Sequence, residues 1–168
     1  YEVQVAASLA NRLAEAAPEA KILNHPARVL ERYPLLRRLH AEGLNDFSAY
    51  RLDGPEMPEK YPVFIRCEDD CLPIDTPLLH SPEEVLGAIE ALRARGVPMK
   101  GRIAVEYCAE PDSDGIYRKY GVCRVGNRVI PHHLFHRDTW YVKHETGRST
   151  GRAEHRQEET RYVLDNPH

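Results

Sequence analysis

The sequence of 168 residues contains no continuous apolar run long enough to cross a membrane. It also lacks a basic segment followed by a short apolar one, so no secretion signal is visible. Nor is there a basic excess: 23 Lys and Arg stand against 26 Asp and Glu, which argues against a dedicated nucleic-acid binder. We therefore expect a cytoplasmic protein that binds neither membranes nor nucleic acids.

Cysteine is scarce, and the four residues are Cys67, Cys71, Cys108 and Cys123. Without a secretion signal, so few cysteines in a chain of this length are expected to be reduced thiols. The Cys67-x₃-Cys71 spacing lies within the range of zinc ligands. Cys108 and Cys123 are separated by fourteen residues and lie in apolar segments, where cysteine commonly acts as a small hydrophobic side chain. A small zinc-binding α+β domain stays open as one alternative.

The residues that are present are typical of a folded protein. Hydrophobic residues make up 42% of the chain and charged residues 29%, a balance that argues against disorder. The length suits one domain or two small lobes. Because the chain begins at Tyr1 without an initiator methionine, we expect it to be a fragment of a longer protein.

Helices are predicted by apolar periodicity and by terminal signals. Apolar residues at every fourth position predict a helix over 5–17. Pro26 suits a first helical turn, and Pro34 is expected to separate two short helices that end at Gly43. Ser81, Pro82 and Glu84 form a capping box that starts a helix ending near Gly96. The charged segment 153–164 is expected to be a solvated helix.

Strands are predicted where short apolar runs are bounded by turn residues. The expected strands are 21–24, 47–52, 61–67, 103–108 and 140–144, with a hairpin of 117–125 and 128–135 around Gly126-Asn127. Helices and strands do not alternate regularly, so the fold class is α+β rather than a wound parallel sheet.

Six segments occur in the order and at the spacing of the ATP-grasp superfamily, which the chain resembles from about Ile22 to Lys143. These segments are Ile22–Pro26, Glu31–Gly43, Tyr61–Arg66, Ser81–Gly96, Ile103–Tyr107 and Val125–Pro131. They are similar in turn to an lNxP entry segment, a basic residue before a helix ending in glycine, a yPvvvK strand, the helix that follows, a liqEy hinge and a vvGdkvv hairpin. The resemblance implies antiparallel sheets with flanking helices and an incomplete C-terminal part. It divides the chain into a helical pre-grasp segment (1–50), a central subdomain (51–115) and the start of a C-terminal subdomain (116–168).

The resemblance also implies an ATP site. Arg32 and Arg66 fall where the family has phosphate-binding cations, and Lys119 would add a third; guanidinium groups suit this role because they bind phosphate bidentately. The hinge of Glu106, Tyr107 and Cys108 resembles the edge strand whose main chain contacts adenine. The candidate ribose-binding carboxylates are those of Glu106, Asp112 and Asp114.

The sequence departs from the family at three places. The segment Cys67–Pro73 is acidic and contains no glycine, whereas many members carry a glycine-rich loop there, and Gly121 stands where many carry arginine. The Mg²⁺ ligands of the family come from an Asp and a later Glu-x-Asn segment, which we expect beyond His168. No metal ligand is therefore predicted within the chain.

Two functions follow from the resemblance. The first is the ATP-binding portion of a ligase that uses ATP and Mg²⁺ to form an acyl-phosphate on a carboxylate, for attack by an amine or thiol of an unknown small-molecule or peptide acceptor. The second is a non-catalytic module that keeps the architecture, which the acidic segment and the missing metal ligands favour. His132, His133 and His136 follow the hairpin, and we interpret them as solvated or acceptor-facing side chains, with a transition-metal pair as the alternative.

Overall fold

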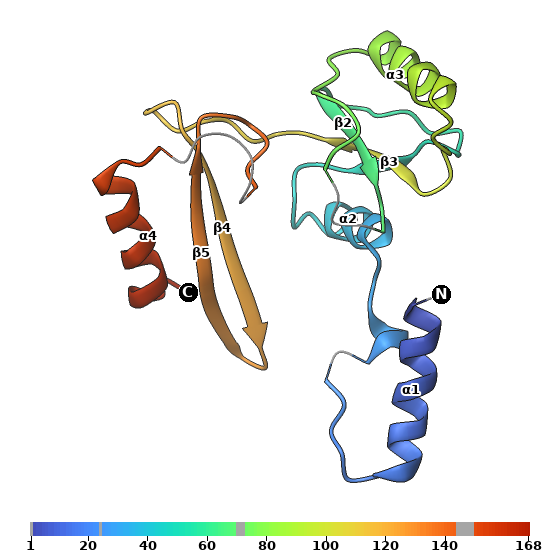
Figure 1. Ribbon diagram of the computed structural model, residues 1–168, viewed down its shortest axis with the longest axis vertical. Helices are drawn as coiled ribbons and strands as arrows, with labels where there is room; N and C mark the ends of the chain where they lie inside the picture. Colours follow the sequence, from blue (N-terminus) through green and yellow to red (C-terminus); the bar gives the residue numbers. More distant parts are fainter. Residues whose placement is uncertain (1, 24, 70–72, 144–149) are drawn as a thin grey trace. The chain divides into compact units, whose positions relative to one another are not determined.

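The computed structural model describes residues 2–23, 25–69, 73–143 and 150–168. The chain divides into two compact units, Tyr1–Cys108 (unit 1) and Ala109–His168 (unit 2) (Figure 1). Both units combine helices with antiparallel strands, so the predicted α+β class is confirmed. Within the described ranges, we find no helix that combines the length and the apolar character needed to span a bilayer.

Unit 1 is built on a three-stranded antiparallel sheet in the order β1-β3-β2. The strands are β1 (Ala49–Arg51), β2 (Val63–Cys67) and β3 (Arg102–Glu106), so the last strand in sequence is the central one. Ile103 of β3 lies opposite Arg51 of β1 and Arg66 of β2. Directly opposed residues share a face of the sheet, so both arginine side chains belong to the same face as Ile103.

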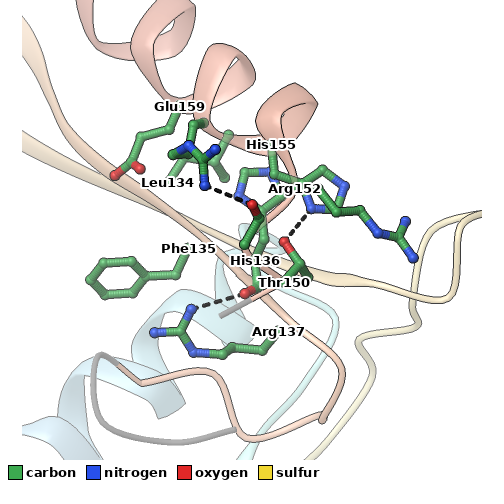
Figure 2. A pocket seen from close by; sticks show the side chains of 10 residues that line it. Leu134, Phe135, His136, Arg137, Thr150, Arg152, His155 and Glu159 are labelled. Atoms are coloured by element: carbon green, nitrogen blue, oxygen red, sulfur yellow. Dashed lines mark hydrogen bonds between the residues drawn. The ribbon is translucent and has the colours of Figure 1, made fainter. Parts of the chain in front are cut away.

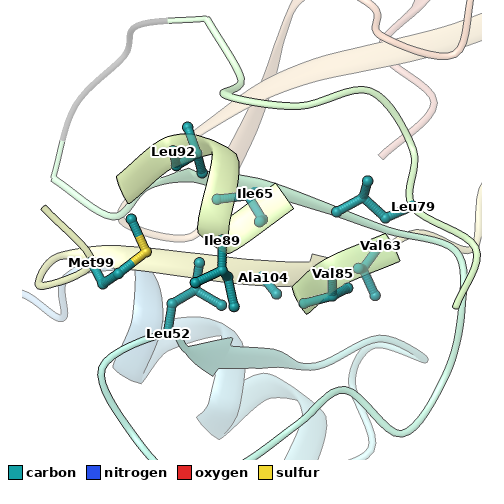
Figure 3. Close-up of a cluster of buried hydrophobic side chains, with 9 residues drawn as sticks. All are labelled: Leu52, Val63, Ile65, Leu79, Val85, Ile89, Leu92, Met99 and Ala104. Atoms are coloured by element: carbon teal, nitrogen blue, oxygen red, sulfur yellow. The ribbon is translucent and has the colours of Figure 1, made fainter. Parts of the chain in front are cut away.

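The other face of this sheet carries the larger core, which packs against α3 (Pro82–Ala94). Figure 3 shows the side chains from the helix and the strands meeting there. The buried members are Leu52, Val63, Ile65, Leu79, Val85, Ile89, Leu92, Met99 and Ala104. Helix α3 begins as predicted: the Oγ of Ser81 accepts a hydrogen bond from Glu84 N at 3.3 Å, and Gly96 follows the helix with a φ of +78°.

Helix α2 (Arg32–Ala41) covers the face that carries Arg51 and Arg66. The small core on this side consists of buried Ala49, Ile103 and Val105 with partly buried neighbours, which are Tyr33, Leu36, Phe47 and Phe64. Pro34 does not separate two helices, which corrects the prediction. It lies in the first turn of α2, where a missing N–H costs nothing because those donors have no intrahelical acceptor. A three-residue 3₁₀ helix, η1 (Pro26–Arg28), precedes α2.

Helix α1 (Glu2–Ala16) is present where periodicity predicts it, and it contacts η1. The strand predicted over 21–24 is wrong for 21–23, which form no regular structure, and Asn24 lies outside the described residues. A run of two apolar residues, Ile22 and Leu23, has no described strand to pair with, and an unpaired segment gains nothing from an extended conformation.

Unit 2 contains a long hairpin, β4 (Tyr117–Val125) and β5 (Arg128–Arg137), and the helix α4 (Ala153–Asp165), which packs against β5. The hairpin and the helix agree with prediction. The register shifts between Gly121 and Val122, which accounts for the imperfect alternation of the sequence. The strand predicted over 140–144 is wrong for 140–143, which form bends and irregular backbone, and residue 144 lies outside the described part.

Gly121 is required by a close contact inside the hairpin. A Cβ at this position would overlap the imidazole ring of His133, which is stacked on Phe135 with ring centroids 4.2 Å apart. We expect Gly121→Ala to destabilise unit 2 by about 1–3 kcal/mol, because overpacking forces the ring out of its stack. Native-state hydrogen exchange of the β4 and β5 amides measures this loss of stability.

The double variant with His133→Ala supplies the control, because it removes the obstructing ring. We expect Gly121→Ala to cost much less in the His133→Ala background, a non-additivity typical of residues in contact. Gly87→Ala on α3, where a Cβ meets nothing within 4 Å, is expected to leave stability unchanged or raised. Equal costs of Gly121→Ala in both backgrounds contradict the steric explanation.

Candidate functional site

Arg32 and Arg66, the two predicted phosphate-binding residues, meet at the end of β2. Nη1 of Arg32 donates hydrogen bonds to the carbonyl oxygens of Cys67 and Glu68, at 2.9 and 2.8 Å. Nε of Arg66 donates to the same Cys67 oxygen at 3.2 Å. Two guanidinium groups from segments more than thirty residues apart therefore converge on one atom, and both side chains are partly exposed.

A third arginine, which the sequence did not single out, lies on the same face of the sheet. Arg51 pairs in a two-pronged manner with the buried carboxylate of Glu68, at 3.0 and 3.2 Å, and its guanidinium lies 4.4 Å from the centroid of the Tyr33 ring. One acidic side chain of the segment Cys67–Pro73 is thus neutralised within the protein, because Glu68 is held by Arg51. Arg51, Arg32 and Arg66 together are called the arginine cluster below.

Carboxylates also gather beside the arginine cluster. Single oxygens of Glu31, Glu68 and Asp69 lie within 4.8 Å of one another. Among the described residues this is the one group of three side chains with that spacing, and it includes no cysteine. Glu31 and Asp69 are exposed while Glu68 is already engaged by Arg51. Exposed acidic groups commonly lie together without a metal, so no ion is assigned here.

Glu106, predicted to contact ribose, is used inside the protein. Its side chain is 4% exposed and accepts hydrogen bonds from Ser48 N at 2.8 Å, Tyr50 Oη at 2.9 Å and Lys60 N at 2.9 Å. Burial acts to raise the pKa of Glu106, but the hydrogen bonds from Ser48, Lys60 and Tyr50 outweigh it, and the net effect lowers the pKa. The carboxylate ties β3 to the segments that carry these three residues.

The hinge of Glu106, Tyr107 and Cys108 is not an edge strand, which corrects the sequence-based expectation. β3 is paired on both sides, and the N–H groups of Glu106 and Tyr107 donate to the carbonyl oxygens of Ser48 and Pro62 at 3.1 and 2.8 Å. Cys108 is exposed, and unit 1 ends there. The N–H groups of Glu106 and Tyr107 are therefore already used within the protein and are not available to a ligand.

In unit 2 the predicted residues Asp114 and Lys119 lie in different surroundings. Asp114 accepts hydrogen bonds from both terminal nitrogens of Arg118, at 2.9 and 3.1 Å, and from Ile116 N at 3.0 Å. The bonds from Arg118 hold the pKa of Asp114 far below its ordinary value. Lys119 is exposed on β4. The neighbouring Arg118 also binds Asp112 at 2.8 Å and Glu158 at 3.0 Å, so it joins the start of β4 to α4.

Two buried histidines complete this network. The rings of His136 and His155 are stacked with centroids 4.5 Å apart and planes 2° from parallel. Nε2 of His136 lies 3.0 Å from Glu158, and Nε2 of His155 lies 3.3 Å from Asp114. His136 was expected to be solvated or to face an acceptor, but it is 5% exposed. His132 is exposed and its Nδ1 lies 2.7 Å from Nδ1 of His133.

The described cysteines do not support the alternative of a zinc site. Cys67, Cys108 and Cys123 are free thiols, and Cys108 and Cys123 are exposed rather than packed as small hydrophobic groups. Cys71, the partner of Cys67 in the proposed spacing, lies outside the described residues. The described thiols therefore do not form a metal centre with one another.

The structure brings together residues that the sequence did not connect. Arg51, Arg118 and His155 were not predicted, although Arg51 lies in a predicted strand and Arg118 precedes the predicted Lys119. The sequence did offer one signal for these arginines, which is their place on a predicted strand. A charged side chain in a sheet is seldom buried unless an oppositely charged group pairs with it. The identity of that partner depends on register and on helix packing, which the local sequence does not specify.

No protein-family model and no curated protein matches the chain. Among solved structures, it is similar to an L-amino acid ligase from Bacillus licheniformis, with a TM-score of 0.47 and 12% identity over 87% of this chain and 35% of that one. It is also similar to a D-alanine–D-alanine ligase from Helicobacter pylori, with a TM-score of 0.41 and 13% identity over 96% of this chain and 54% of that one. The chain spans about a third and about half of their lengths, so their activities and substrates are not transferred to it.

Proposed function

We propose that the chain is an ATP-binding portion of an ATP-grasp ligase, in which the arginine cluster of unit 1 contacts the phosphates. The observation that carries the proposal is the convergence of Arg32 and Arg66 on the Cys67 carbonyl oxygen. A triphosphate brings several negative charges to one place, and guanidinium groups from separate segments stabilise it without a large rearrangement. The order of the sequence motifs supports the same assignment.

The proposed roles of the other residues follow from their surroundings. Arg32 and Arg66 bind phosphate, and Arg51 neutralises Glu68 so that this carboxylate does not repel the ligand. The exposed main chain at Cys108 is the proposed adenine contact. Tyr107 supports it, since its ring packs edge-on against Phe64 with centroids 6.5 Å apart.

The remaining candidates receive different roles in this proposal. Glu106 and Asp114 position their own segments, because both carboxylates already accept several hydrogen bonds from the protein. Lys119 stays a proposed additional cation on β4. The Mg²⁺ ions that neutralise the developing phosphoryl charge are proposed to be held by residues outside this chain. The ligase reaction, the carboxylate and its acceptor belong to the whole protein and remain part of the proposal.

Calorimetric titration with Mg·ATP tests the phosphate assignment. We expect saturable binding by the unmodified protein and about tenfold weaker binding by Arg66→Ala, the loss typical of one charge-assisted hydrogen bond. Arg93→Ala is the matched control, because it removes the same charge from the exposed surface of α3, which packs on the opposite face of the sheet. Binding that is unaffected by Arg66→Ala, or weakened equally by Arg93→Ala, contradicts the assignment.

A second candidate function is a non-catalytic module, and one observation favours it. Arg32 donates to two main-chain carbonyls, so the guanidinium also acts as a clamp between α2 and the end of β2. In this case the cluster stabilises unit 1 and binds no nucleotide. Absence of heat with Mg·ATP, combined with faster hydrogen exchange in β2 of Arg32→Ala, supports this candidate over the first.

A further inference from the structure

A basic cavity lies at the start of α4, entirely within unit 2 (Figure 2). Its volume of about 420 Å³ is in the range of small-molecule sites. The charged and titratable side chains that line it are Arg137, Arg152, Arg156, His136, His155 and Glu159. The lining thus includes three permanently cationic groups and one carboxylate, and Leu134 and Phe135 form its apolar part.

The deepest basic groups of the cavity are held in place by the protein. His136, Arg137 and His155 are 5, 6 and 5% exposed. Arg137 donates from Nη1 to His136 O at 2.9 Å and from Nε to Lys143 O at 3.2 Å. The first of these bonds is drawn as a dashed line in Figure 2. Hydroxyl Oγ1 of Thr150 is hydrogen-bonded to Nδ1 of His155. A ligand entering this cavity meets groups that are already ordered, which lowers the entropic cost of binding.

The charges at the start of α4 have an unfavourable sign for a helix N-terminus. Arg152 is the N-cap residue and provides no side-chain cap, and Arg156 lies one turn later. The first turn of a helix carries a partial positive charge and unpaired N–H groups, so arginines there add charge of the same sign. Glu154 offsets this weakly, since it is 70% exposed and 4.0 Å from Arg152. An anion in the cavity would relieve the repulsion.

We propose that this cavity binds a small molecule through a carboxylate or phosphate group, held between Arg137 and the first turn of α4. Asp114 and Glu158 are the carboxylates that contact the two histidines. They do not occupy the site, because both are paired with Arg118. The site shares no residue with the arginine cluster. The proposal of an anion site can therefore be tested independently of ATP binding.

Titration with inorganic phosphate and, separately, with succinate tests the site, with NMR detection of the His136 and His155 ring protons. We expect a saturable change of both signals with at least one anion. Tighter binding of phosphate assigns a phosphoryl group to the natural ligand, and tighter binding of succinate assigns a carboxylate. No saturable change with either anion overturns the proposal.

Charge variants on α4 distinguish the cavity from general surface charge. Arg152→Gln and Arg156→Gln are each expected to weaken anion binding about tenfold. Both side chains are partly or fully exposed, and hydrogen exchange of the α4 amides verifies that the helix is retained. Arg161→Gln, which removes the same charge from the same helix outside the cavity, should change the affinity less than twofold. Equal effects of Arg161→Gln and Arg156→Gln, or no effect of either cavity variant, overturn the proposal.

Discussion

Replacing Glu106 with alanine is expected to destabilise unit 1 by about 3 kcal/mol, the range for a buried polar network that loses its acceptor. The variant leaves Ser48 N, Lys60 N and the Tyr50 hydroxyl without the carboxylate to which all three donate. Chemical denaturation at neutral pH measures the loss. Hydrogen exchange is expected to quicken in β1 and β3 and to stay unchanged in the β4–β5 hairpin.

Tyr50→Phe is the control for this prediction, because it removes one donor and leaves the carboxylate with two. It should cost about 1 kcal/mol. The contribution of Glu106 to stability should also depend on pH in a defined direction. Because the folded protein holds the pKa of Glu106 below its ordinary value of 4.5, its contribution is complete above that pH and is lost as the pH falls through the lowered pKa. A stability difference between wild type and Glu106→Ala that grows on acidification contradicts this role.

Arg118→Met is expected to destabilise unit 2 by about 2 kcal/mol, because it leaves Asp112, Asp114 and Glu158 close together without their cation, while their partial exposure to solvent reduces the cost. Methionine retains the apolar stem, so the change isolates the guanidinium. The bonds from Arg118 lower the pKa of Asp114; burial opposes this effect at Glu158, whose pKa is nevertheless lowered by Arg118 and His136. Hydrogen exchange of the β5 and α4 amides at neutral pH measures the loss.

The neighbouring Lys119→Met is the matched control for Arg118→Met, because it removes the same charge from an exposed position on the same strand. Its effect on stability is expected to stay below about 0.5 kcal/mol. Lowered carboxylate pKa values stabilise the fold above the ordinary values of 3.8 and 4.5 and cease to do so as the carboxylates are protonated. The gap between wild type and Arg118→Met should therefore narrow in acid, and a constant gap argues against an electrostatic cause.

Signals within a single element were sufficient to predict much of the fold. The capping box at Ser81 predicted the start of α3, because a helix N-terminus is specified by residues that are adjacent in sequence. Gly126-Asn127 likewise placed the hairpin. The strand expected over 140–144 is wrong for 140–143, because an apolar run needs a neighbouring strand to pair with. The effect predicted for Pro34 is wrong because it depends on the position of the proline within the helix.

The candidate sites were less accessible from the sequence than the elements. The motif order selected Arg32 and Arg66, and the structure brings them together, while their role as phosphate ligands remains a prediction. It also selected Lys119, although the neighbouring Arg118 makes the ion pairs with Asp112, Asp114 and Glu158. Adjacent strand residues point to opposite faces, and which of them meets α4 depends on packing. The same limitation applies to Glu106, whose three donors lie 46 to 58 positions earlier in the chain.

The late position of β3 in the sequence has a consequence for synthesis of the protein. β1 and β2 leave the ribosome first, but they are not neighbours in the sheet, and the strand that each pairs with is β3, which ends at Glu106. A nascent chain shorter than this has two strands that lack their shared neighbour and cannot close its sheet, since the paired residues are 35 to 56 positions apart in the sequence. Unit 1 is therefore expected to gain protease resistance in one step, once its middle strand has cleared the exit tunnel.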